Sequence, residues 1–176
     1  GAEPRVLQAA RQFHALRLGA PILLGDRAKV KETAADLNIA LDGIRVINPE
    51  DSEELDNFAR RFHSLRREKG IREEEAREAM KQANYFGAMM VAMHQADGLV
   101  SGVSHITGSV LRPLFQIIKL APGAGVASSC MVMEVEDTRI GEKGVLFMAD
   151  CGVVPEPTVE QLAEIAVSTA QLSKHL

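Results

Sequence analysis

Hydrophobic residues recur at helical spacing over several stretches of the chain. Between residues 4 and 18 they return every three or four positions, which predicts an amphipathic helix that Gly19 ends. In the stretch 84–96 nearly every position is apolar, so we expect a helix buried on all sides. The same spacing, with its caps and breakers, predicts further helices over residues 26–37, 51–69, 72–82, 107–120 and 158–174.

Short apolar runs between these helices predict strands. The runs cover residues 21–24, 44–47, 97–102, 125–135 and 145–149. Alternation of apolar strands with helices is typical of an α/β fold, in which helices cover both faces of a mainly parallel sheet and form three layers. Ala121-Pro122-Gly123 combines turn residues with a change of rhythm, so we place a domain boundary there, between 1–121 and 122–176.

Composition narrows the class of protein. Of the 176 residues, 46% are hydrophobic and 25% are charged, which is typical of a globular protein. No uncharged apolar run reaches the roughly 20 residues of a membrane-spanning helix. The net charge of -4 and the aromatic content of 4% argue against nucleic-acid binding. Two cysteines without metal-ligand spacing predict free thiols in a reducing cytoplasm, and we interpret Cys151 as a buried structural thiol.

One segment, residues 101–113 (SGVSHITGSVLRP), is dense in small and hydroxyl residues between a predicted strand and a predicted helix. Ligands of α/β sheets bind beyond the carboxyl ends of strands, and a helix N-terminus offers N–H groups to an anion. Arg112 adds a cation with the geometry of a phosphate-binding fork. The segment therefore predicts a phosphate or carboxylate cradle. Its candidate hydroxyl donors are Ser101, Ser104, Thr107 and Ser109.

Other interpretations of these residues stay open. The cradle pattern is also that of an ordinary N-capped helix with Arg112 on the surface. His105 is either a general base or anion donor, or a structural hydrogen-bonding group. Arg66, near the end of a helix, either complements the helix dipole or contacts a polyanionic ligand. The histidines form no cluster, so we expect no metal site.

Several sequence blocks follow one another in a set order. They are EPRVLQAA (3–10), PILLGD (21–26), NYFGAMMV (84–91), ADGLVSG (96–102), QIIK (116–119), ADC (149–151) and PTVEQLAEIA (157–166). The spacing of His105, Thr107 and Arg112-Pro113 fits between the fourth and fifth blocks. In this order, and over essentially the whole chain, they resemble the phosphate acetyltransferase (phosphotransacetylase) family.

The resemblance implies reversible transfer of an acetyl group between acetyl phosphate and coenzyme A. Coenzyme A is then a substrate, and neither a cofactor nor a metal is required. The implied architecture has two α/β domains related in fold to isocitrate dehydrogenases, with the active cleft between them, and a homodimer is expected. The resemblance places Arg112 as the catalytic cation. It assigns phosphate binding to Ser101, His105, Thr107, Ser109 and Arg112, and coenzyme A binding to Arg5 and Arg66.

The chain also departs from the family pattern. Ser109-Val110 stands where many members have Asp-Thr, and Val154 stands where an asparagine is common. The family's first strand and its later half, which carries the catalytic base, are not in the chain, so we expect the chain alone to be inactive. Three alternatives remain. They are acyl transfer of the phosphate butyryltransferase kind, a non-catalytic metabolite-sensing domain like those fused to some malic enzymes, and a generic ligand-binding α/β module.

Overall fold

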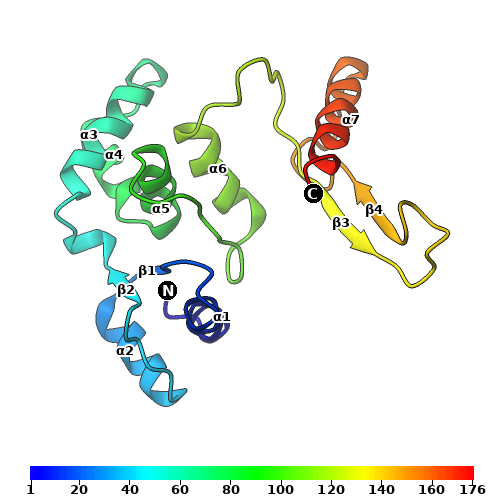
Figure 1. Cartoon of the computed structure of the whole chain (residues 1–176). Helices are drawn as coiled ribbons and strands as arrows, with labels where there is room; N and C mark the ends of the chain where they lie inside the picture. The colour runs from blue at the N-terminus through cyan, green and yellow to red at the C-terminus, as the bar shows by residue number, and fades with distance from the viewer. The chain divides into compact units, whose positions relative to one another are not determined.

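The computed structural model describes residues 1–176, and its internal contacts divide the chain into two compact units (Figure 1). Unit 1 is Gly1–Lys119 and unit 2 is Leu120–Leu176. Each unit is described by itself below. The assignment of 1–121 as a first domain and of 122–176 as the start of a second stays a prediction.

Unit 1 begins with two helices and a pair of parallel strands. These are α1 (Pro4–Ala15), β1 (Ile22–Leu24), α2 (Arg27–Asp36) and β2 (Arg45–Ile47). In the register of the pair, Leu23 lies opposite Val46. Leu7, Val30 and Ile44 pack with Leu23 in one buried cluster, because the apolar faces of both helices turn toward the strands. Side-chain caps fix where these helices start: Asp26 accepts hydrogen bonds from the N–H groups of the first turn of α2, as the sequence predicts.

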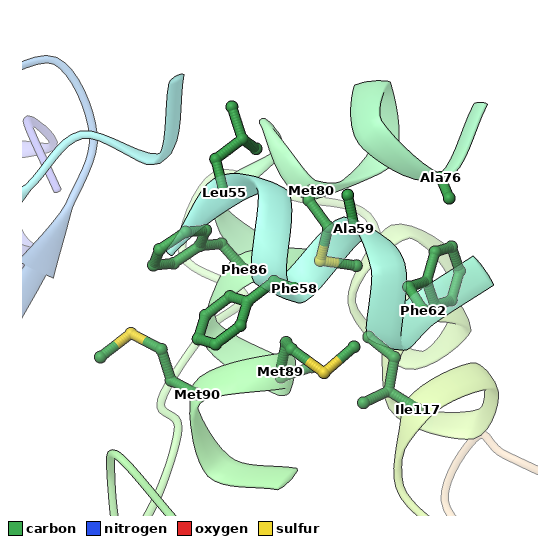
Figure 2. Packing of buried hydrophobic residues seen from close by; sticks show 11 residues of the cluster. Leu55, Phe58, Ala59, Phe62, Ala76, Met80, Phe86, Met89, Met90 and Ile117 are labelled. Carbon is green, nitrogen blue, oxygen red and sulfur yellow. The ribbon is translucent and has the colours of Figure 1, made fainter. Parts of the chain in front are cut away.

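The rest of unit 1 is helical. Its elements are η1 (Pro49–Asp51), α3 (Leu55–Arg66), η2 (Arg67–Lys69), α4 (Glu73–Met80), α5 (Ala83–Ala92) and α6 (Thr107–Ile117). Phe58 and Phe62 of α3 meet Phe86 and Met89 of α5 in a second buried cluster, which Figure 2 shows. The rings of Phe58 and Phe86 lie 4.9 Å apart, a normal aromatic contact. This core fixes the places of α5 and α6, which carry most of the candidate site.

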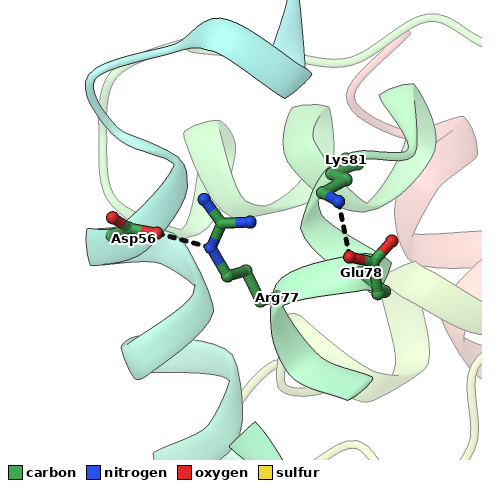
Figure 3. A network of polar contacts seen from close by, with 4 residues as sticks. All are labelled: Asp56, Arg77, Glu78 and Lys81. Atoms are coloured by element: carbon green, nitrogen blue, oxygen red, sulfur yellow. Dashed lines mark hydrogen bonds and ion pairs between the residues drawn. The ribbon is translucent and has the colours of Figure 1, made fainter. Parts of the chain in front are cut away.

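Two polar contacts on the surface of α3 and α4 accompany this packing. The Arg77 guanidinium donates to Asp56 across the two helices at 2.8 Å, and Lys81 pairs with Glu78 within one turn (Figure 3). All four side chains are partly exposed, so we expect each pair to stabilise the fold by less than about 1 kcal/mol. The apolar cluster, rather than these ion pairs, therefore holds α3 against α4.

Unit 2 contains a strand pair and one helix. The elements are β3 (Met131–Glu134), β4 (Val145–Met148) and α7 (Val159–Ser173). β3 and β4 are antiparallel, and Val132 lies opposite Phe147. Thr158 and Gln161 form a capping box that begins α7. None of the helices in the chain has the length and hydrophobicity needed to cross a membrane.

The fold is mixed α/β, but the predicted single sheet is not confirmed. The structure contains one parallel and one antiparallel pair of strands. The predicted strand at 97–102 is wrong, because no strand lies beside this segment to complete a hydrogen-bonded ladder. Leu99 packs against the core from a loop, while Val100 is 99% exposed. The helix predicted over 84–96 is shorter than expected: it ends at Ala92, and the residues that follow are exposed.

Candidate functional site: an anion cradle on α5 and α6

The start of α6 forms the centre of the candidate site. Thr107 is the first helical residue, and the residue before it, Ile106, has no side-chain oxygen to cap the helix. In contrast, α2 and α7 are capped by Asp26 and Thr158. The N–H of Ser109 donates to the Ile106 carbonyl at 3.0 Å, and the other first-turn N–H groups of α6 lack a side-chain acceptor, so together with the helix dipole they favour an anion.

Asn84 of α5 connects the loop before α6 to the helix itself. The Ser101 hydroxyl donates to the Asn84 side-chain oxygen at 2.8 Å, and the Asn84 amide donates to the Ser109 carbonyl at 3.3 Å. The Ser109 hydroxyl donates to the Ile106 carbonyl at 2.8 Å. The hydroxyl hydrogens of Ser101 and Ser109 thus bond protein acceptors, and the anion-binding roles of both serines stay predictions.

His105 and Thr107 lie in the exposed part of the cradle. The backbone N–H of His105 donates to Gly102 at 3.3 Å, which closes a turn just before the helix. Neither side chain forms a hydrogen bond within the chain, so both are available to a ligand. The exposed hydroxyl and imidazole place polar groups beside the first turn of α6, where the sequence predicts them.

Tyr85 of α5 forms a second part of the candidate site, where its side chain contacts α3 and α6. Its hydroxyl donates to the Gln116 side-chain oxygen at 2.9 Å, and its ring lies edge-on to Phe62 with centroids 5.4 Å apart. Arg112 precedes Gln116 by one helical turn, and Arg66 follows Phe62 by one turn. Burial raises the pKa of Tyr85, and the nearby charges of Arg112 and Arg66 lower it by less. The charges of Arg66 on α3 and of Arg112 on α6 therefore both act on one phenol.

Neither Arg66 nor Arg112 has a carboxylate partner. The ion pairs of the chain involve Arg5, His63, Arg72, Arg77, Lys81 and Arg139. An exposed arginine without a partner is common, but Arg66 is half-buried. Cations that protein carboxylates do not neutralise are suited to bind an anionic ligand.

Arg5, predicted to bind coenzyme A, belongs to a different part of unit 1. Its guanidinium pairs with Glu3 at 2.6 Å at the start of α1, and its side chain is exposed. That pair has to open, or to take a ligand on its outer side, before Arg5 meets an anion. Its role stays a prediction.

Asp150 organises the turn after β4 in unit 2. Its carboxylate accepts hydrogen bonds from the hydroxyl and the N–H of Ser129 and from the N–H groups of Gly152, Val153 and Val154. The hydroxyl bond from Ser129, followed by the backbone donors, holds the pKa of Asp150 well below its usual range. The neighbouring Cys151 is exposed, so its interpretation as a buried thiol is wrong. Cys151 lies in the turn after β4 and not within the strand.

Asn84, Tyr85 and Gln116 were not recognised as site residues in the sequence. Asn84 and Tyr85 are the two polar side chains in the first half of the apolar α5, and Gln116 lies at helical spacing from Arg112. Polar residues at these positions of otherwise apolar helices indicate candidate site residues from the sequence alone. No group of three or more His, Cys, Asp and Glu side chains is placed to hold a metal ion.

Comparisons with known proteins show the family of the chain. The phosphate acetyl/butaryl transferase family model matches residues 1–176. The phosphate acetyltransferase of Thermoanaerobacterium thermosaccharolyticum is 46% identical over the whole chain, which covers 53% of that relative. The Clostridium acetobutylicum phosphate acetyltransferase is 40% identical, with the same shares covered. The chain thus spans about half the length of the curated relatives it matches.

Solved structures give the same assignment. The EutD phosphotransacetylase from Staphylococcus aureus is 39% identical, with a TM-score of 0.83, and the match covers 97% of this chain and 49% of that one. A phosphotransacetylase from Streptococcus pyogenes is 36% identical with a TM-score of 0.89, covering 98% and 51%. The match over every residue, together with the cradle at the start of α6, leads to one conclusion: this chain belongs to the phosphate acetyl/butaryl transferase family.

Proposed function

We propose that the protein to which this chain belongs transfers an acetyl group reversibly between acetyl phosphate and coenzyme A. The observation that carries the proposal is the pair of arginines without carboxylate partners, Arg66 and Arg112, beside an uncapped helix start. Both substrates bear phosphate groups, which such an arrangement can bind. Relatives named phosphate acetyltransferase support the choice of acyl group.

The proposed reaction is a direct displacement. The thiolate of coenzyme A attacks the acetyl carbonyl carbon, the bond from that carbon to the phosphate oxygen breaks, and phosphate leaves with the electron pair. Arg112 stabilises the negative charge that develops on the leaving phosphate, and the first-turn N–H groups of α6 hold its oxygens. Thr107 and His105 add donors at the edge, and Arg66 binds a coenzyme A phosphate. Binding both substrates side by side contributes further to the rate.

The candidate site is exposed to solvent in this chain, and a displacement by a thiolate requires exclusion of water. We also propose that β1 and β2 form part of a mainly parallel, three-layer sheet, as in isocitrate dehydrogenases. A cytoplasmic homodimer completes the proposal. The catalytic base is expected outside these 176 residues, so the chain alone should show no turnover.

The test is release of phosphate from acetyl phosphate in the presence of coenzyme A, measured on the longer protein that contains this sequence. We expect Arg112→Ala to lower kcat/KM by about 100-fold, because a charge-assisted hydrogen bond to the leaving phosphate contributes roughly 1.5–3 kcal/mol. Arg139→Ala is the matched control, since Arg139 pairs with Asp137 in the exposed hairpin loop of unit 2.

Activity that survives Arg112→Ala unchanged would contradict the proposed role of the cradle. If butyryl phosphate is turned over faster than acetyl phosphate, the acyl group is assigned wrongly within the same family. Binding of acetyl phosphate without any turnover would instead support the non-catalytic, metabolite-sensing alternative.

A further inference from the structure

Tyr85 is the one tyrosine of the chain, and it lies on a helix that is otherwise mostly apolar. Phe86 through Met90, which follow it, are buried in the core of unit 1. The Tyr85 side chain is half-buried and reaches two other helices, contacting Phe62 on α3 with its ring and Gln116 on α6 with its hydroxyl. It therefore connects the helix that carries Arg66 with the helix that carries Arg112.

Helical periodicity places each arginine on the helix face that contacts Tyr85. Arg66 lies four residues after Phe62 on α3, and Arg112 lies four residues before Gln116 on α6. Residues four apart share a helix face, so each arginine stands one turn from a direct contact of Tyr85. Both positive charges act on the phenol. Each arginine then shares a helix face with a residue that Tyr85 contacts.

The chemistry of a phenol suits this position better than that of a carboxylate. A carboxylate here would pair with both arginines and compete with any incoming anion. The Tyr85 hydroxyl uses its hydrogen on Gln116, so its oxygen lone pairs remain for the positive side of the site. A phenol is uncharged at ordinary pH, and burial raises the pKa of Tyr85 further, so Tyr85 can order the arginines without neutralising them.

We infer that Tyr85 is a positioning residue that, with its partner Gln116, holds Arg66 and Arg112 around one phosphate-type anion. The inference deepens the proposed function and rests on it, since the anion is the phosphate of acetyl phosphate or a phosphate of coenzyme A. It also joins Arg66 and Arg112 in one subsite, and so replaces the proposed division in which Arg112 holds the leaving phosphate and Arg66 a coenzyme A phosphate.

The direct test is anion binding to the 176-residue chain, with inorganic phosphate and coenzyme A titrated separately by calorimetry. We expect Tyr85→Phe to weaken binding of one of these ligands about three- to tenfold, as expected for loss of one hydrogen bond. Tyr85→Phe keeps the ring contact with Phe62 and removes only the hydroxyl. Gln116→Met breaks the same hydrogen bond from the other side and should weaken binding in the same direction.

A double variant separates positioning from a general loss of structure. In an Arg112→Ala background, Tyr85→Phe should weaken binding by less than twofold, because the group that it positions is gone. A purely structural effect would be as large in both backgrounds. Thr33→Val is the matched control, since it also removes one hydroxyl, from a hydrogen bond to the Lys29 carbonyl on α2.

Fluorescence gives a second readout. The chain has one tyrosine and no tryptophan, so its intrinsic emission comes from Tyr85 alone. The bound anion should change this emission in the original chain, and the change should disappear in Arg66→Ala and in Arg112→Ala. In the longer protein, Tyr85→Phe should lower kcat/KM about three- to tenfold, with part of the loss in kcat, because Arg112 acts on the charge that develops on the leaving phosphate.

Three results would overturn the inference: no binding of either ligand, equal binding by Tyr85→Phe and the original chain, or binding that leaves the Tyr85 emission unchanged. None of these results tests the proposed function, which is tested separately by phosphate release from acetyl phosphate by the longer protein. If that activity is present and depends on Arg112 while Tyr85→Phe has no effect, the function holds and the positioning role fails.

Discussion

Phe58, Phe62 and Phe86 are at most 1% exposed in unit 1, whereas Ile165 is the one buried hydrophobic residue of unit 2. Met131, Val132 and Met133 along β3 are all more than 40% exposed, although their sequence is as apolar as that of the core helices. Unit 2 keeps its local shape through polar contacts. The Asp150 carboxylate accepts hydrogen bonds from backbone N–H groups around the turn after β4, and Glu164 accepts one from the N–H of Val126 at 3.1 Å. The same kinds of residue thus build an apolar core in one unit and an exposed surface in the other.

The difference shows that apolar composition does not by itself produce a core. Burial needs a second apolar face within reach, which α3, α4 and α5 provide for one another in unit 1. The candidate site follows the same division, since Asn84, Tyr85 and Arg112 lie on helices that this core supports. A site that holds an anion in a fixed geometry belongs on rigid elements.

The largest difference in stability between the two units should come from Phe58→Ala. Phe58 is fully buried between α3 and α5, so the substitution should lower the free energy of unfolding of unit 1 by about 3–5 kcal/mol. Urea unfolding followed by circular dichroism measures it. Leu162→Ala in α7 is the control: its side chain is 55% exposed, and we expect a change below about 0.5 kcal/mol. Equal effects of the two substitutions would contradict the contrast between the units.

Lowering the pH should destabilise unit 2 but leave unit 1 unaffected, and this effect should be smaller than that of Phe58→Ala. Hydrogen bonds lower the pKa of Asp150 below its ordinary value of 3.8, so its charged form stabilises unit 2 above that pH. This stabilisation should be lost as the pH falls below 3.8, while the apolar core of unit 1 is unaffected by the same protonation. Hydrogen exchange at the amides of Val153 and Val154, measured between pH 5 and pH 2, reports the loss.

Asp150→Asn should remove this pH dependence, since its amide cannot ionise, and should speed exchange at the same amides at pH 5. Asp137→Asn provides the comparison, because Asp137 pairs only with Arg139 in the exposed hairpin loop. If Asp150→Asn exchanges like the original chain, Asp150 does not organise the turn.

The smallest effect is expected at the start of α7. Thr158→Ala removes the hydroxyl that accepts from the Gln161 N–H at 3.2 Å, and loss of such a cap costs about 1 kcal/mol of helix stability. Thermal unfolding followed at 222 nm detects it. Ser168→Ala, an exposed position within the same helix, should cost nothing, since alanine is the better helix former. A loss of the same size in both would mean that the capping box does not set the helix start.

Much of the local structure was predictable from the sequence. The apolar stripe of α3 with its period of 3.6, the Asp26 cap and the breaks at Gly19 and Asn48-Pro49 act within a few residues, so they are visible in the chain. The segment around Thr107 stands out for the same reason, because hydroxyl residues and an arginine follow one another along one loop and helix, and its anion-binding role stays a prediction. The lack of a strand at 97–102 was not predictable, since an apolar run becomes a strand only where a partner strand completes its hydrogen bonds.

By itself the sequence determined the helices, the caps and the segment in which an anion-binding site would lie, because these depend on neighbours within one or two turns. Only the tertiary structure decided that β3 and β4 run antiparallel, and that Tyr85 meets a residue of α6 distant along the chain. It also decided that Tyr85 contacts both the helix that carries Arg66 and the helix that carries Arg112. Such contacts depend on how whole elements pack, and the packing is set by the buried faces of all of them together.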